Sequence, residues 1–184
     1  IHAKVQEQAD SCSRNEEVPS LYPILQEELN LAAPNIILTQ DLCQVCAPSS
    51  ANVRDILEQE ESTVKIVSLS PHSLTDVAEN MLTVATACGV PERGVAAKEA
   101  FLGNLRLLQE TIERARASTT TKIPRIFLLE WLDPPFDGGH WIPGMMRYAG
   151  CEPAVEKTTK KSVAMTWADV QTADADVILI ACCG

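Results

Sequence analysis

The sequence has few aromatic residues and little positive charge, and these shortages narrow the possible functions. Three Trp, two Tyr and three Phe occur among 184 residues. Lysine and arginine number 15 against 25 aspartates and glutamates, which leaves a formal net charge of −10. Nonspecific binding of nucleic acid requires positive charge against the phosphates, so this charge balance argues against a nucleic-acid partner.

Long apolar runs and common catalytic motifs are also missing. The longest apolar run, residues 177–181, has strand length and is far shorter than the roughly 20 residues of a membrane span. We therefore expect no membrane insertion. No Walker loop, GxGxxG or GxSxG pattern occurs. No signal peptide is visible, although the chain does not begin with Met.

Strand-length and helix-length hydrophobic patterns alternate along the chain. This alternation predicts an α/β architecture with mostly parallel strands. We expect helices over residues 21–31 (with Ser20 as N-cap), from Ser49 or Ser50, over 73–89, over 141–148 and from Thr166. We expect strands at residues 36–39, 64–69, 124–129 and 177–181.

One helical pattern, residues 92–117, is much longer than the others. At helical rise it spans about 40 Å, the length of a small domain, so it suits a connection between two lobes. We therefore predict three parts: an N-terminal lobe over residues 1–90, a connecting helix over 91–118 and a C-terminal lobe over 119–184.

Three loops follow predicted strands: residues 40–43, 70–73 and 130–140. Ligands of open α/β sheets bind beyond the carboxyl ends of strands. Residues 130–141 combine two Trp, one Phe, three acids and one His with a Pro-Pro and a Gly-Gly pair. Flat apolar side chains with polar handles suit a large planar ligand. A rigid turn that plugs the end of a sheet explains the same composition equally well.

Histidines and cysteines in these loops leave alternatives open. His140 and His72 each have two roles available, as a metal ligand or as a hydrogen-bonding residue that orients its loop. Cys43 and Cys46 form a CxxC pair, but no second pair completes a zinc site, and seven cysteines cannot all pair internally. Glu130 and Asp133 suit an acid/base pair, although the neighbouring aromatics favour a binding wall.

Several of these segments, in order, resemble one known family. Residues 35–46, 67–74, 129–136 and 139–143 are similar to the cobalamin-binding branch of the periplasmic substrate-binding proteins. Trp167, residues 173–178 and 183–184 extend the resemblance, which covers about residues 20–184. Four separate segments in the right order make the resemblance more specific than any one motif.

The resemblance implies two α/β lobes with mostly parallel sheets, joined by a long backbone helix of the class III type. It implies a ligand between the lobes, an extracytoplasmic or periplasmic location, and delivery of vitamin B12 (or a related iron chelate) to an ABC importer. Cobalamin is then the bound ligand, and we expect no prosthetic group, no catalysis and no metal held by the protein itself. The expected ligand-binding residues are Gln40, Asp41, Cys43, His72, Glu130, Trp131, Asp133, Phe136, His140 and Trp141.

The sequence also departs from the family. The first strand and helix of the family's amino-terminal lobe are missing before Ile1, and its later helices are missing after residue 181, so the fold is expected to be incomplete at both ends. The usual Pro-Cys-Gly is replaced by Cys182-Cys183-Gly184. Besides the hypothesis of a protein that binds vitamin B12 or a related corrinoid, we consider two others. One is a metal or redox protein that uses the CxxC pair, and the other is a relative that has the fold but does not bind the ligand.

Overall fold

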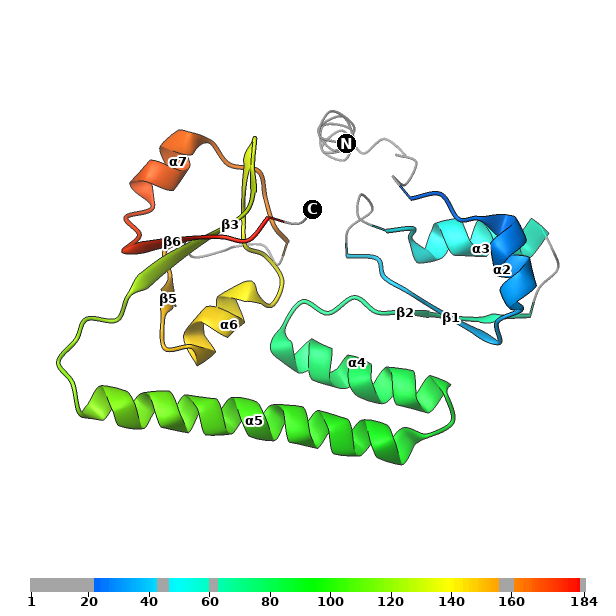
Figure 1. The fold of residues 1–184 in the computed structure, drawn as a ribbon, viewed down its shortest axis with the longest axis horizontal. Helices are drawn as coiled ribbons and strands as arrows, with labels where there is room; N and C mark the ends of the chain where they lie inside the picture. The colour runs from blue at the N-terminus through cyan, green and yellow to red at the C-terminus, as the bar shows by residue number, and fades with distance from the viewer. Residues whose placement is uncertain (1–21, 43–46, 60–62, 156–160, 183–184) are drawn as a thin grey trace. The chain divides into compact units, whose positions relative to one another are not determined.

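A computed structural model describes residues 22–42, 47–59, 63–155 and 161–182 of the chain (Figure 1). The chain divides into two compact units. The first consists of residues 1–70 and 83–91, and the second of residues 71–82 and 92–184. The division places most of the long helix with the second unit. The three-part organisation expected from the sequence stays a prediction.

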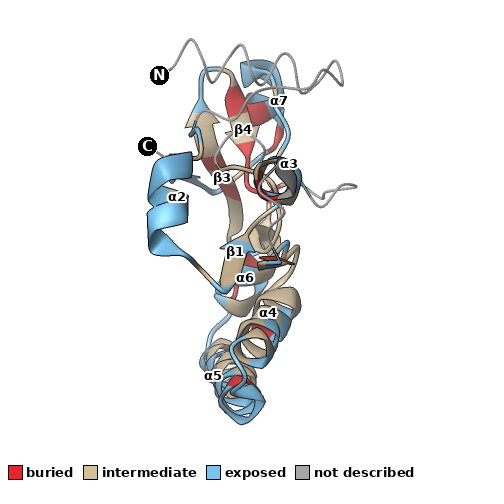
Figure 2. Ribbon diagram, turned by 90° about the vertical axis from the view of Figure 1, so that its right-hand side faces the viewer, coloured by how far each residue is buried: buried red, intermediate tan, exposed pale blue. Residues whose placement is uncertain are grey.

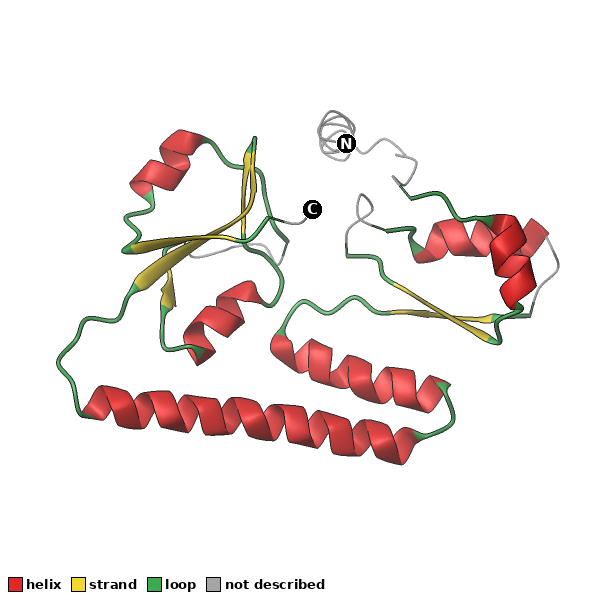
Figure 3. Cartoon of the chain, viewed as in Figure 1, coloured by secondary structure: helices red, strands yellow, loops and turns green. Residues whose placement is uncertain are grey.

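The first unit contains a parallel pair of short strands. β1 (Ile36–Thr39) pairs with β2 (Lys65–Ser68), with Ile37 opposite Ile66 (Figure 3). The strands have the predicted type and lie within the predicted ranges. Between them, α3 (Ser50–Gln59) buries Val53 and Leu57. Because β1 and β2 are parallel, their carboxyl ends lie at one edge of the pair.

The first helix is shorter than the sequence predicts. α2 (Gln26–Ala32) begins after Leu25, whose backbone is extended, so the prediction of a helix from residue 21 is wrong for residues 22–25. Pro23 disfavours helical backbone only at Tyr22, and it is the extended backbone of Leu25, with a ψ of 98°, that places the start of the helix at Gln26. The helix ends at Ala33, which has a φ of 43°.

Two helices follow β2, and both confirm the sequence predictions. α4 (Leu74–Ala87) starts at the predicted N-cap, where Ser73 Oγ accepts a hydrogen bond from the Asp76 N–H at 3.1 Å. It ends before Gly89, whose φ of 76° reverses the chain. α5 (Pro91–Ala117) is the predicted long helix, with 27 residues. No helix in the described part of the chain is both long enough and apolar enough to cross a membrane.

The second unit is built around one central strand. β3 (Arg125–Leu132) pairs in parallel with β5 (Glu152–Pro153) and β6 (Val177–Ile180), and antiparallel with β4 (Pro135–Asp137). The mostly parallel pairing is confirmed. α6 (Ile142–Tyr148) and α7 (Trp167–Thr172) complete the unit. Its core contains Phe127, Leu129, Ala154, Val170 and Ala173, and β3 carries two of these buried residues (Figure 2).

The segment after Leu129 is a β-hairpin and not the predicted loop. β3 continues to Leu132, turns at Asp133-Pro134 through a cis peptide bond and returns as β4. The prolines indicate a break in strand structure from sequence alone. However, Pro134 lies in the turn and Pro135 begins the strand, where its carbonyl accepts from Met165 at 2.8 Å. β5 was also missed, because two residues are too few to show periodicity.

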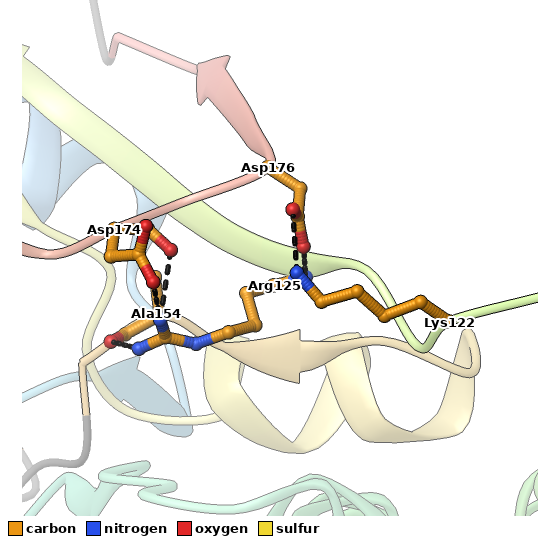
Figure 4. Close-up of polar contacts among 5 residues, drawn as sticks. All are labelled: Lys122, Arg125, Ala154, Asp174 and Asp176. Atoms are coloured by element: carbon orange, nitrogen blue, oxygen red, sulfur yellow. Dashed lines mark hydrogen bonds and ion pairs between the residues drawn. The ribbon is translucent and has the colours of Figure 1, made fainter.

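A polar cluster connects the start of β3 to the residues next to β5 and β6 (Figure 4). The Arg125 guanidinium donates to Asp174 Oδ2 at 2.9 Å and to the carbonyl of Ala154, beside β5, at 2.8 Å. Asp176 Oδ2 accepts from the Arg125 N–H at 2.8 Å, and Asp176 Oδ1 from Lys122 Nζ at 2.9 Å. These hydrogen bonds from Arg125 and Lys122 hold the pKa of Asp176 below its ordinary value.

Candidate functional site

The predicted site residues fall into both units, at or next to strand ends. Gln40 and Asp41 follow β1 in the first unit. The other predicted site residues that the structure describes belong to the second unit. Cys43 and its CxxC partner Cys46 lie outside the described residues. The two groups are therefore described one unit at a time.

Asp41 follows β1 and forms hydrogen bonds with the end of β2 and the first turn of α3. Its carboxylate accepts from the Ser50 N–H at 2.7 Å, from Ser50 Oγ at 2.8 Å and from Ser68 Oγ. Partial burial opposes ionisation, but the hydrogen bonds from Ser68 and Ser50, with the nearby Arg54 charge, outweigh it and lower the pKa of Asp41. Asp41 is therefore a carboxylate at neutral pH whose negative charge lies at the amino end of α3.

Two further contacts shape the same strand end. Gln40 Oε1 accepts from the Leu42 N–H at 2.8 Å, and the Asp41 N–H donates to Ser70 Oγ at 3.3 Å. Ser68 was not among the predicted site residues. The sequence offered a weak signal for it, since Ser68 and Ser70 alternate at the end of a predicted strand that follows an acidic loop.

The hairpin of the second unit carries a cross-strand aromatic pair. Trp131 of β3 lies opposite Phe136 of β4, and paired residues of antiparallel strands project from the same face. Both side chains are half-buried. The Trp131 indole N–H donates to the carbonyl of Asp133 at 3.0 Å, within the turn. The turn therefore orients the indole ring.

Two acids connect the hairpin to residues 162 and 163. Glu130 accepts from Ser162 Oγ and, at 3.4 Å, from the Gly139 N–H. Asp137 is 5% exposed and accepts from the Val163 N–H at 2.8 Å. Asp137 and Ser162 were missed as site-shaping residues, because their partners lie about 30 residues away in the sequence. Glu130 has partners within its own chain, and its contact with a ligand stays a prediction.

The structure brings His72 and His140 together, 68 residues apart in the chain. Their Nδ1 atoms are 3.3 Å apart and their ring centroids 5.5 Å apart. Trp141 lies beside them, its ring centroid 5.9 Å from that of His140. His140 has a φ of 53°, and the His72 N–H donates to Asp76 Oδ2 at 2.9 Å. Both histidines thus occupy defined backbone positions.

The second unit therefore holds two groups of predicted residues. His72, His140 and Trp141 form one, and Trp131, Asp133 and Phe136 form the other. A recess next to β3 and α6 contains none of the predicted site residues; it is lined by Ile126, Phe127, Leu128, Asp137, Gly138, Pro143, Met146, Pro153 and Val155. Among the described residues, no group of three or more His, Cys, Asp or Glu side chains is placed to hold a metal ion.

The fold is shared with solved substrate-binding proteins. The periplasmic vitamin B12 binding protein BtuF of Vibrio cholerae matches 90% of this chain with a TM-score of 0.61 and 17% identity. An ABC transporter substrate-binding protein from Listeria monocytogenes EGD-e matches 86% with a TM-score of 0.67 and 15% identity. The siderophore binding protein FhuD from Vibrio cholerae, with Fe3+–Desferal bound, matches 86% with a TM-score of 0.61 and 18% identity.

These likenesses define the fold class. The chain has the α/β fold, with its long helix, of the periplasmic substrate-binding proteins. It spans 60%, 57% and 59% of the lengths of the three proteins, respectively. No protein-family model and no curated protein matches the sequence.

Proposed function

We propose that this chain is part of a substrate-binding protein that carries a corrinoid of the vitamin B12 type to an ABC importer. The observation that carries the proposal is the aromatic hairpin. Trp131 and Phe136 lie opposite one another at the carboxyl end of β3, where ligands of α/β sheets bind. The Asp133 carbonyl orients the indole of Trp131.

The chemistry of the hairpin suits a corrinoid. A corrin ring presents a broad apolar surface with amide side chains at its rim. Aromatic side chains bury such a surface at a small cost in conformational entropy, because they have few rotatable bonds. Two acids at the end of β3, Glu130 and Asp133, are proposed to accept hydrogen bonds from the amides. The fold shared with a vitamin B12 binding protein supports this assignment.

An iron chelate is the alternative ligand. The same fold occurs in FhuD with Fe3+–Desferal, at an identity similar to that of the vitamin B12 binding protein. Large metal chelates share a broad surface and polar rim groups, so one aromatic wall accommodates either ligand. The CxxC pair, Cys43 and Cys46, is the basis of a further hypothesis, in which the chain is a redox or metal-binding protein.

Delivery to an importer would place the protein outside the cytoplasm. The net charge of −10 provides acidic side chains for docking onto a basic surface of the importer. The likeness to an ABC transporter substrate-binding protein supports this partner.

Calorimetric titration with cyanocobalamin, and separately with Fe3+–Desferal, tests the proposal. We expect saturable heat with cyanocobalamin and an affinity at least about tenfold lower for Trp131→Ala, as for an aromatic anchor of a binding surface. The matched control is Trp167→Ala, because Trp167 is 49% exposed on α7 and is not a predicted site residue. Binding of Fe3+–Desferal alone would replace the corrinoid with the iron chelate, and absence of heat with both would contradict the proposal.

A further inference from the structure

The imidazoles of His72 and His140 meet through one nitrogen each. The Nδ1 atoms are 3.3 Å apart while the ring centroids are 5.5 Å apart. Face-to-face stacking would bring the centroids about as close as the nitrogens. The ring planes are inclined by 25°, and the larger centroid separation means that the two rings are nearest to each other at their Nδ1 atoms.

The separation of the two nitrogens matches that of two ligands of one metal ion. Zinc–imidazole bonds are about 2.0–2.1 Å long, so two nitrogens on a tetrahedral zinc ion are about 3.3–3.4 Å apart. Without an ion, one Nδ1–H donates to the other Nδ1 in a hydrogen bond of 3.3 Å, slightly longer than the usual range of about 2.7–3.2 Å, and a metal ion would take the place of that proton. An ion bonded to both nitrogens needs no change in their separation.

Neighbouring contacts fix the backbone positions of both histidines, as metal binding by this pair requires. The Asp76 carboxylate accepts from the His72 N–H at 2.9 Å, just before α4 begins. His140 lies between Gly139, whose backbone packs against Ser162, and Trp141, the N-cap of α6. Metal ligands bind more tightly when their surroundings orient them before the ion arrives.

We propose that Nδ1 of His72 and Nδ1 of His140 bind one exchangeable divalent transition-metal ion, of the class that includes Zn2+, Co2+ and Cu2+. Imidazole nitrogen is a favoured ligand of these ions. The described residues supply no third His, Cys, Asp or Glu ligand to a metal group. We assign only these two histidines to the site, and propose that water or a donor atom of a bound small molecule completes the coordination.

His72 and His140 are also among the expected corrinoid-binding residues, so the metal site shares residues with the proposed function; titration with the bare ion tests it separately from cyanocobalamin. Calorimetric titration of the chelator-treated full chain with Zn2+ tests it, with thiols kept reduced. We expect one site, weakened at least about tenfold by His72→Asn or by His140→Asn. Asparagine at residue 140 tolerates the positive φ there. The control is His2→Asn, which changes the remaining histidine of the chain and is expected to leave Zn2+ affinity unchanged.

Two measurements on the unaltered protein keep the test decisive if a variant fails to fold. In a 15N NMR spectrum of the imidazoles, Zn2+ should shift Nδ1 of two histidines and leave His2 unchanged. The absorption spectrum with Co2+ should lack thiolate charge-transfer bands. Thiolate bands, a shift at His2, or Zn2+ affinity unchanged in folded His72→Asn and His140→Asn variants would overturn the assignment.

Discussion

Gly139 connects the hairpin to His140, and Gly139→Ala tests how tightly this segment is packed. A Cβ at residue 139 would lie 2.2 Å from the Ser162 backbone nitrogen. Ordinary van der Waals contacts of a Cβ atom are 3.4 Å or longer. The clash is with main chain, so a side-chain rotation does not relieve it. Relief requires a movement of more than 1 Å at Ser162, whose hydroxyl donates to Glu130 and whose neighbour Val163 donates its N–H to Asp137.

The expected cost follows from this forced movement. Overpacking a well-packed site typically destabilises a protein by about 1–3 kcal/mol. Alanine has less conformational entropy than glycine in the unfolded chain, and this difference stabilises the folded state by only about 0.4–1 kcal/mol. With a urea dependence of about 1–3 kcal/mol per molar, the unfolding midpoint should fall by roughly 1 M.

Tryptophan fluorescence during urea unfolding measures the unfolding midpoint of the second unit, which contains residue 139. Trp131, Trp141 and Trp167 are the three tryptophans, and all belong to the second unit. Gly144→Ala is the matched control: a Cβ there meets only Leu74, at 3.8 Å, so we expect an unchanged or slightly higher midpoint. A Gly139→Ala midpoint equal to that of the original chain would refute the close packing of Gly139 against Ser162.

Two further predictions concern the second unit. Leu129 is 2% exposed in its core, so Leu129→Ala should cost about 2–5 kcal/mol of unfolding free energy in the same urea assay. A cost below 1 kcal/mol would mean that the site is not core. Arg125 and Lys122 lower the pKa of Asp176, so its contribution to stability is present above the ordinary value of 3.8 and is lost as pH falls through the lowered pKa. Thermal unfolding between about pH 5 and pH 2 should show this loss, and Asp176→Asn should make the acid dependence less steep; an identical pH profile for the variant would argue against the Asp176 contacts.

Local patterns were sufficient to predict most secondary-structure elements. Periodicity located the strands around β1, β2, β3 and β6, and Ser73 marked the start of α4. The length of the apolar pattern located α5. These features depend on neighbouring residues, which is why a sequence shows them directly.

The errors came from two proline-containing segments and from one strand of two residues. Pro134 and Pro135 indicated a loop, but pairing between Trp131 and Phe136 makes the segment a hairpin. The segment that contains Pro23 is extended at Leu25, so α2 begins at Gln26. β5 is held by Arg125 and Ile126 of β3, so nothing in its own two residues predicts a strand.

The sequence by itself determined the α/β class, the long helix and the strand ends at which the acidic, aromatic and histidine residues occur. Only the tertiary structure decided which of these residues meet. His72 and His140 were separate candidates, each with two possible roles, until folding placed their Nδ1 atoms 3.3 Å apart. Asp41 likewise required Ser50 and Ser68 from two other elements to complete its contacts. Such contacts join residues many positions apart, and their geometry is set by the packing of whole elements, which no local pattern contains.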